Sequence, residues 1–358
     1  MNKLLLVILS VVLVSGLIFS GCGAEEPETT IPKVVPTPEQ PLELKLSSWV
    51  PPVSLPAKDM IDPWIATIYE RTGGRVKITH YAAQSLGAQA DHYNMVINRQ
   101  ADIVQSGGTT GILRMIEVSN LPFLYTTAEM AGVVHWQLSE KHLWDAELKN
   151  VKVLWLMPVA PDNLCTNIKQ VKTLEDMKGM KIATGSDMGL RTLKALGATP
   201  TFVPPPEIYT ALERGLVDAI STNWEKAIVF KEHEVTKYRT GSINMWVNVM
   251  PIYMNLDAWN ELPADIQQIF EETGGLAYSQ RNGALFDTVD QEFRGIIEGY
   301  DKEVGNPPFY DISADERARW IAATAPIHDE WVNELEADGL PARALLDDAN
   351  ALAEAFGK

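Results

Sequence analysis

Two spacings organise the apolar positions of this chain from about residue 44 onward. Residues 44–49 alternate between apolar and polar, which predicts a β-strand. Asp62 and Pro63 then suit the N-cap and first position of a helix, and Gly73 and Gly74 suit its end. One face of that helix is predicted from residues at helical spacing: Ile61, Trp64, Ile65, Ile68 and Tyr69.

The same alternation of strand and helix continues along the chain. Further strands are predicted at 76–80 and 101–105 around a helix at 89–99, and this βαβαβ order favours a parallel sheet covered by helices. The pattern restarts after residue 150, so we expect two α/β lobes in series. The second series comprises strands at 151–157, 181–184, 201–203 and 217–221 and helices at 190–196 and 207–214. A long helical region closes the chain, at 263–304 with a break near Gly274, at 315–336 and at 341–356.

The N-terminus has the order of a secretory signal. Lys3 precedes an apolar run at 4–19, and small residues then lead to Cys22. The run is shorter than the roughly 20 apolar residues of a membrane span. Residues 19–22, Phe-Ser-Gly-Cys, resemble a bacterial lipobox, which implies removal of residues 1–21 and lipidation of Cys22. An uncleaved N-terminal anchor is the alternative, and both interpretations place the rest of the chain outside the cytoplasmic membrane.

Composition adds three expectations. Residues 22–43 are rich in Glu, Pro and Thr, which predicts a disordered tether. The formal net charge of −17 argues against nucleic-acid binding, which needs a basic surface. With Cys22 lipidated, Cys165 has no disulfide partner, and we expect a partly buried structural cysteine.

Several segments, in order, resemble the substrate-binding proteins of TRAP transporters, the DctP family or solute-binding protein family 7. The most specific is Thr-Leu-Glu-Asp-Met-Lys-Gly-Met-Lys-Ile at residues 173–182. Other matching segments lie at 72–81, 101–104, 121–124, 194–200, 207–218 and 255–259.

The resemblance implies a two-lobed, periplasmic-binding-protein-like fold of type II with the ligand in the cleft between the lobes. Lobe I would comprise residues 44–161 and about 251–290, and lobe II residues 162–250 and about 291–358. It also implies a monomeric, non-enzymatic receptor that takes a small organic molecule, an organic acid or an aromatic or apolar solute. The partners would be one small and one large TRAP membrane subunit.

One position departs from the family pattern. The family typically has an arginine two residues after the lysine of the Lys-Ile motif, where it holds a ligand carboxylate. Here that position is Ala183, and a second, often basic position falls on Asp162 or Asn163. A ligand acid could instead be held by Arg191, by backbone N–H groups or by a metal.

Aromatic and amide side chains offer another kind of pocket. Trp49 and Trp224 follow predicted strands, whose carboxyl ends face the crevice in open α/β sheets. Trp64, Trp144, Trp155 and Trp320 are instead expected in the core, and 106–111 is expected to form a tight loop at the cleft edge. The full predicted ligand-contact set is Trp49, Gln84, Ser106, Asn163, Arg191, Thr222, Asn223, Trp224, Trp246, Asn248 and Tyr253.

No cofactor is predicted. The six histidines show no metal-binding spacing, and Glu232-His233-Glu234 is expected to be a solvated helix end, although an oxygen-ligated Ca²⁺ in the cleft stays open. Two other functions also stay open: presentation of the ligand to a sensor kinase, and hydrolysis by a tethered enzyme. Hydrolysis would need a nucleophile and a base, and no nucleophile motif such as Gly-x-Ser-x-Gly is present.

Overall fold

The computed structural model describes residues 36–106 and 112–357. The predicted signal peptide, Cys22 and residues 107–111 lie outside the described residues. The chain divides into two units, residues 1–34 and 35–358, and everything below concerns the second unit. Among its described residues, no helix has the length and apolar character needed to cross a membrane.

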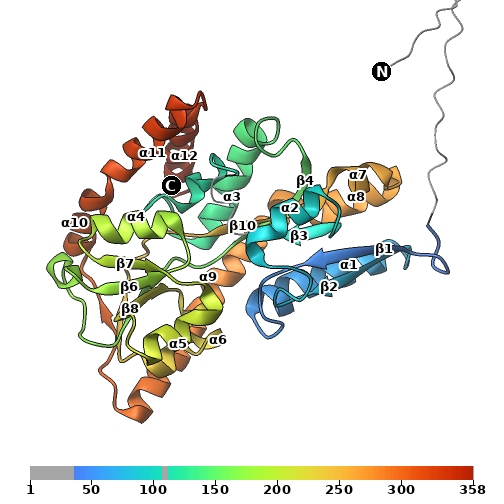
Figure 1. The fold of residues 1–358 in the computed structure, drawn as a ribbon. Coiled ribbons are helices and arrows are strands. Elements are labelled where there is room, and N and C mark those ends of the chain that lie inside the picture. Colours follow the sequence, from blue (N-terminus) through green and yellow to red (C-terminus); the bar gives the residue numbers. More distant parts are fainter. Residues whose placement is uncertain (1–35, 107–111, 358) are drawn as a thin grey trace, which may run out of the picture. The chain divides into compact units, whose positions relative to one another are not determined.

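The first sheet has five strands in the order β2-β1-β3-β10-β4 (Figure 1). Strands β2, β1 and β3 are parallel, as the βαβαβ pattern predicts, whereas β10 is antiparallel to both of its neighbours. Strand β1 begins at Leu42, two residues before its predicted start and inside the predicted tether. The strands are β1 (Leu42–Ser47), β2 (Val76–Tyr81), β3 (Ile103–Gln105), β4 (Val151–Pro158) and β10 (Val249–Asn255).

The second sheet has six strands in the order β11-β9-β5-β8-β6-β7. Its parallel part, β7-β6-β8, matches the predicted series, and β5 joins it antiparallel to β8. The apolar pattern did not indicate β5, β9 or β11. The strands are β5 (Asn163–Thr166), β6 (Lys181–Thr184), β7 (Thr199–Phe202), β8 (Ala219–Thr222), β9 (Tyr238–Gly241) and β11 (Tyr310–Asp311). Two α/β sheets linked by segments of chain confirm the predicted fold class.

Helices cover both sheets. The predicted break at Gly274 separates α8 from α9, and Pro326 divides the predicted helix at 315–336 into α10 and α11. The helices of the first half are α1 (Asp62–Arg71), α2 (His92–Ile97), α3 (Ala128–Leu138), α4 (Asp187–Ala195), α5 (Ile208–Glu213) and α6 (Trp224–Val229). Those of the second half are α7 (Leu256–Glu261), α8 (Ala264–Thr273), α9 (Gly275–Val304), α10 (Ala314–Thr324), α11 (Pro326–Ala337) and α12 (Ala342–Phe356).

The predicted N-cap of α1 is wrong. A π-helical turn, Pro56–Ile61, runs directly into α1, so its N-terminal N–H groups already have partners and no side-chain cap is formed. The Asp62 carboxylate instead accepts a hydrogen bond from His80 Nδ1 at 2.7 Å.

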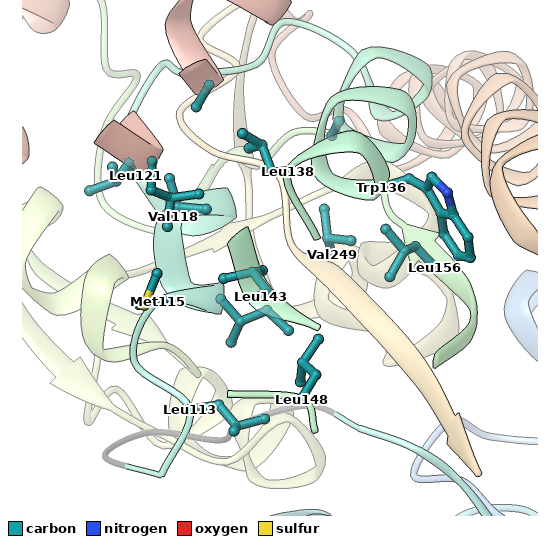
Figure 2. Packing of buried hydrophobic residues seen from close by; sticks show 14 of the residues in the cluster. Leu113, Met115, Val118, Leu121, Trp136, Leu138, Leu143, Leu148, Leu156 and Val249 are labelled. Carbon is teal, nitrogen blue, oxygen red and sulfur yellow. The ribbon is translucent and has the colours of Figure 1, made fainter. Parts of the chain in front are cut away.

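The C-terminal helices pack with the first sheet. Trp331 of α11 and Leu345 of α12 lie in the same buried cluster as Val134 of α3 and Leu156 of β4. Figure 2 shows part of this cluster, with side chains of α3, β4 and β10 beside those of residues 113–121. Helices α11 and α12 thus pack with elements of the first sheet, whereas the sequence-based prediction placed all of 291–358 in lobe II. The sequence pattern does not indicate that α11 and α12 pack with the first sheet, because these contacts join segments about 200 residues apart.

Helix α9 packs against elements of both sheets. It contacts α3 and β4 on one side and α6 on the other. Near its middle, Asp287 accepts hydrogen bonds from Ala128 N and Glu129 N at the start of α3. One turn later, Asp290 accepts hydrogen bonds from the first two N–H groups of α6. Each carboxylate thus caps a helix of a different lobe.

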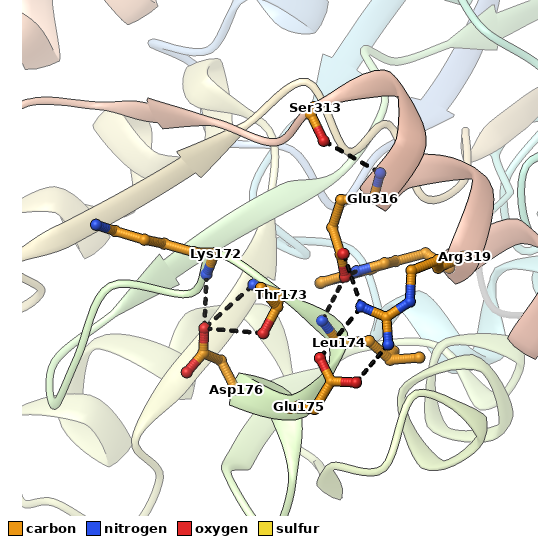
Figure 3. A network of polar contacts seen from close by, with 9 residues as sticks. Lys172, Thr173, Leu174, Glu175, Asp176, Ser313, Glu316 and Arg319 are labelled. Atoms are coloured by element: carbon orange, nitrogen blue, oxygen red, sulfur yellow. Dashed lines mark hydrogen bonds and ion pairs between the residues drawn. The ribbon is translucent and has the colours of Figure 1, made fainter.

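The most specific family segment, residues 173–182, has a structural role. The Asp176 carboxylate accepts hydrogen bonds from Lys172 N and Thr173 N, which closes a capping box around the turn Leu174–Met177 (Figure 3). Glu316 of α10 accepts a hydrogen bond from Leu174 N, and Arg319 pairs with both Glu316 and Glu175. This network joins the turn before β6 to α10.

Candidate functional site

A cavity of about 150 Å³ lies where the chain crosses between the two sheets. Two crossing segments run side by side there, since Val159 N donates to Asn248 O and Asp162 N donates to Trp246 O, both at 3.0 Å. The cavity is lined from the first sheet's side by residues such as Trp49 and Ser106, and from the second sheet's side by residues such as Thr184. An engineered cavity of this size in another protein holds benzene, so the space suits a one-ring solute.

Six of the predicted contact residues line this cavity: Trp49, Ser106, Asn223, Trp246, Asn248 and Tyr253. Phe230 and Phe286 add two further aromatic rings. Aromatic walls with a few polar groups are typical of small-molecule sites.

Several polar atoms of the lining are buried and have no hydrogen-bond partner among the described residues. They are Trp49 Nε1, Trp246 Nε1, Ser106 Oγ, Tyr253 Oη and Asn120 Oδ1. Leaving such a group unpaired costs about 1–3 kcal/mol. Their concentration around one cavity indicates a place where a bound molecule would complete the hydrogen bonds.

Arg191 and Trp224 lie elsewhere, in contrast to the prediction of ligand contact. The Arg191 guanidinium is exposed and pairs with Glu334 of α11 at 2.8 Å. The Trp224 ring is 2% exposed and packs edge-on against Phe309, with ring centroids 4.9 Å apart. Neither side chain is among those lining the cavity.

Gln84, Asn163 and Thr222 also use their side chains within the fold. Gln84 Oε1 accepts a hydrogen bond from the backbone of Gln89, a lining residue. Asn163 Oδ1 accepts one from Ile243 N at 3.0 Å, which holds the segment that leads to Trp246. Thr222 is fully buried at the end of β8. Their location favours a role in positioning the lining.

Ala183, the position where the family usually has arginine, is fully buried in the core of the second sheet. The ionisable side chains that line the cavity are instead Glu117, Asp162, Asp187, Glu225 and Lys226. Sequence reasoning missed all of them as ligand-site residues except the Asp162 position. Glu225 and Lys226 directly follow the predicted Asn223-Trp224 pair, and that adjacency was the available signal.

Burial raises the pKa values of three carboxyl groups in and near α6. Desolvation raises the pKa of Glu225 to about 7, although Leu55 N donates to its carboxylate. Desolvation likewise raises the pKa of Asp290 to about 7 and that of Glu232 to about 7. Glu232 is fully buried, so the prediction of a solvated helix end is wrong for this residue.

A Ser–His–Asp chain of hydrogen bonds occurs outside the cavity. His80 Nε2 lies 2.7 Å from Ser48 Oγ, and His80 Nδ1 lies 2.7 Å from Asp62. This order resembles a hydrolase triad. Ser48 is fully buried and is not among the lining residues, so no substrate reaches its hydroxyl. These two hydrogen bonds link the residue that follows β1 to His80 of β2 and to Asp62 of α1.

Two further predictions concern metals and thiols. In residues 36–106 and 112–357, no group of three or more His, Cys, Asp or Glu side chains is arranged to hold a metal ion. Cys165 is fully buried, and burial raises the pKa of its thiol to about 12, which agrees with a structural cysteine.

Comparison with known proteins identifies the family. Residues 47–335 match the model of the bacterial extracellular solute-binding proteins, family 7. The chain belongs to this family. It is similar to the C4-dicarboxylate-binding periplasmic protein DctP of Rhodobacter capsulatus, with 28% identity over 169 residues. That match covers 47% of this chain and about half, 49%, of the relative.

Solved structures of family members share the fold. A TRAP solute-binding protein from Rhodoferax ferrireducens, in complex with copurified benzoate, is 29% identical with a TM-score of 0.82, covering 88% of this chain and 98% of that one. One from Bordetella bronchiseptica with bound mandelate is 26% identical with a TM-score of 0.78, covering 88% and 100%. The family and its fold thus agree with the sequence-based resemblance.

Proposed function

We propose that this chain is the extracytoplasmic receptor of a TRAP-type secondary transporter. It captures a small, one-ring-sized organic solute and delivers it to one small and one large membrane subunit. The observation that carries the proposal is the cavity between the sheets, where aromatic walls surround buried polar atoms that have no partner. The relatives that hold benzoate and mandelate support a ligand of this size.

The test is ligand binding by the purified full chain. A library of small acids, amides, amines and neutral aromatics is screened by thermal shift, since a ligand at 100 times its Kd stabilises the folded state by about 2.7 kcal/mol. Trp246→Ala serves as the variant with a damaged cavity, and Arg191→Ala as a control away from it. If no class of solute in the library raises the melting temperature, the receptor proposal is contradicted.

The anchoring is part of the proposal. Cys22 would carry the lipid that holds the receptor at the outer face of the cytoplasmic membrane, while the following residues act as the tether. Cys22→Ser is expected to release the protein from the membrane fraction and to abolish labelling by a fatty-acid probe. Genes for the two membrane subunits beside this gene would favour transport over presentation to a sensor kinase.

A further inference from the structure

The cavity has an unusual balance of charge for a receptor of organic anions. Among the described lining residues, four carry carboxyl groups, Glu117, Asp162, Asp187 and Glu225, and Lys226 alone carries a positive charge. Residues 107–111, which lie outside the described part, contain only Gly and Thr. Even with Glu225 protonated, as its pKa of about 7 permits, the other three carboxyl groups outnumber the one ammonium group, so an incoming carboxylate would meet an excess of negative charge in a poorly solvated space.

Lys226 already has its counter-ion within the protein. Its Nζ lies 3.5 Å from Asp162 Oδ1, and the other oxygen of Asp162 accepts a hydrogen bond from Ser221 Oγ at 2.8 Å. Asp162 is 2% exposed and the Lys226 side chain is 20% exposed, so the carboxylate of this pair is shielded from water and its ammonium group mostly so. A carboxylate ligand would have to compete with Asp162 for the ammonium group.

The partnerless atoms supply a second, independent observation. Trp49 Nε1 and Trp246 Nε1 can only donate hydrogen bonds, whereas Asn120 Oδ1 can only accept. Tyr253 Oη and Ser106 Oγ can do either. Trp246, Tyr253 and Ser106 are each at most 1% exposed. A complementary ligand therefore presents an acceptor and also N–H donors, which the carboxylates and Asn120 would receive.

We propose that the ligand of this receptor carries no net negative charge: it is a neutral or cationic, amide- or amine-bearing solute of about one ring. The inference rests on the proposed receptor function. The indole N–H groups would bind its acceptor atom, and the carboxylates on the second-sheet side of the cavity would bind its N–H groups.

Matched ligands separate charge from shape. The aromatic series shares a ring and a planar head group and differs in charge: benzoate, benzamide and benzamidine. The acyclic series comprises succinate, succinamide and 1,4-diaminobutane. Affinities for the purified full chain are measured by calorimetry, and the molecule that co-purifies is identified by native mass spectrometry. In any series that binds, we expect the uncharged or cationic member to bind at least tenfold tighter than the carboxylate.

Each outcome decides one of the two proposals. A carboxylate that binds tightest, or a co-purified anion, overturns the charge inference and leaves the receptor function standing. If neither series binds, the solutes that bind in the thermal-shift library are compared by charge. Anionic binders overturn the charge inference, and neutral or cationic binders support it. Absence of binding by every class removes the receptor function itself.

A charge variant tests the role of the internal ion pair. Asp162→Asn removes the counter-ion of Lys226, and we expect it to raise the affinity for benzoate relative to benzamidine at least tenfold. Asp265→Asn, which removes the exposed partner of Arg75, is the matched control and should leave the ratio unchanged. An unchanged ratio in Asp162→Asn, with the fold intact by circular dichroism, would contradict the inference.

Discussion

Asp290 on α9 accepts a 2.8 Å hydrogen bond from the backbone N–H of Trp224, the first residue of α6. The carboxyl group is 3% exposed, and desolvation raises its pKa to about 7. Glu225 and Glu232, which are also buried, have pKa values of about 7 for the same reason. This region of the protein therefore holds protons in the folded state that the unfolded chain releases.

The first prediction concerns stability against pH. Because the folded pKa values of these three carboxyl groups lie above their unfolded ones, the three groups bind more protons in the folded state between about pH 4 and pH 7, and their contribution to stability falls as the pH rises. One pKa unit corresponds to about 1.4 kcal/mol, so these three groups should together remove at least about 2 kcal/mol of stability between pH 5 and pH 8. The buried His135, whose pKa desolvation lowers to about 4, acts in the opposite direction, so the contribution of the carboxyl groups is obtained by comparison with a variant that lacks one of them. Chemical denaturation at both pH values measures it.

Two variants make that prediction specific. Asp290→Asn removes one titrating group, so its stability should depend less steeply on pH. Asp265→Asn removes an exposed carboxyl group whose pKa is lowered by its hydrogen bond from Arg75, so the slope above pH 5 should not change. A pH slope in Asp290→Asn as steep as that of the unaltered protein would contradict the argument.

The second prediction concerns the packing of α9 against α3. A Cβ atom on Gly283 would lie 2.6 Å from both Ala128 O and Glu129 Cα, which are backbone atoms that cannot move aside. Gly283→Ala should therefore destabilise the protein by about 2 kcal/mol or more. Gly299 lies on the same helix with no atom within 4 Å of the added Cβ, so Gly299→Ala should stabilise by about 0.5–1 kcal/mol. Urea titrations measure the free energy of unfolding of both variants. Equal changes in the two variants would contradict the prediction.

The third prediction separates two tryptophans. Trp224→Ala should cost about 3–5 kcal/mol of stability, as expected for a buried aromatic residue, and leave ligand affinity unchanged. Trp246→Phe keeps a ring but deletes the partnerless indole N–H, so it should weaken binding about tenfold at little cost in stability. Melting temperature and calorimetric Kd are measured on both proteins. Weaker ligand binding by a folded Trp224→Ala variant would show that Trp224 belongs to the ligand site.

Local periodicity explains what could be predicted from the sequence. The β1-α1-β2 unit and the break at Gly274 depend on neighbouring residues, and both appear in the fold. The pairing of β10 with β3 and β4 and the packing of α12 on α3 depend on residues far apart, so no local pattern indicates them.

The site was predictable to a similar degree. Trp49 and Asn223, which line the cavity, were predicted because strand ends face the crevice. Glu225 and Lys226, in contrast, have the sequence of an ordinary solvated helix. The burial of Glu225 and the partial burial of Lys226 are decided by the tertiary packing around α6, including α9, more than 45 residues away. Trp224, the first residue of α6, packs against Phe309 for the same reason.

The two capping carboxylates of α9 have a mechanical consequence. Asp287 is bonded to the start of α3 and Asp290 to the start of α6, and three residues of helix rise by only about 4.5 Å. Any rotation of one half of the molecule against the other must then be absorbed as bending within that single turn, or break one of the caps. This turn of α9 is therefore the place where the strain of such a rotation would concentrate.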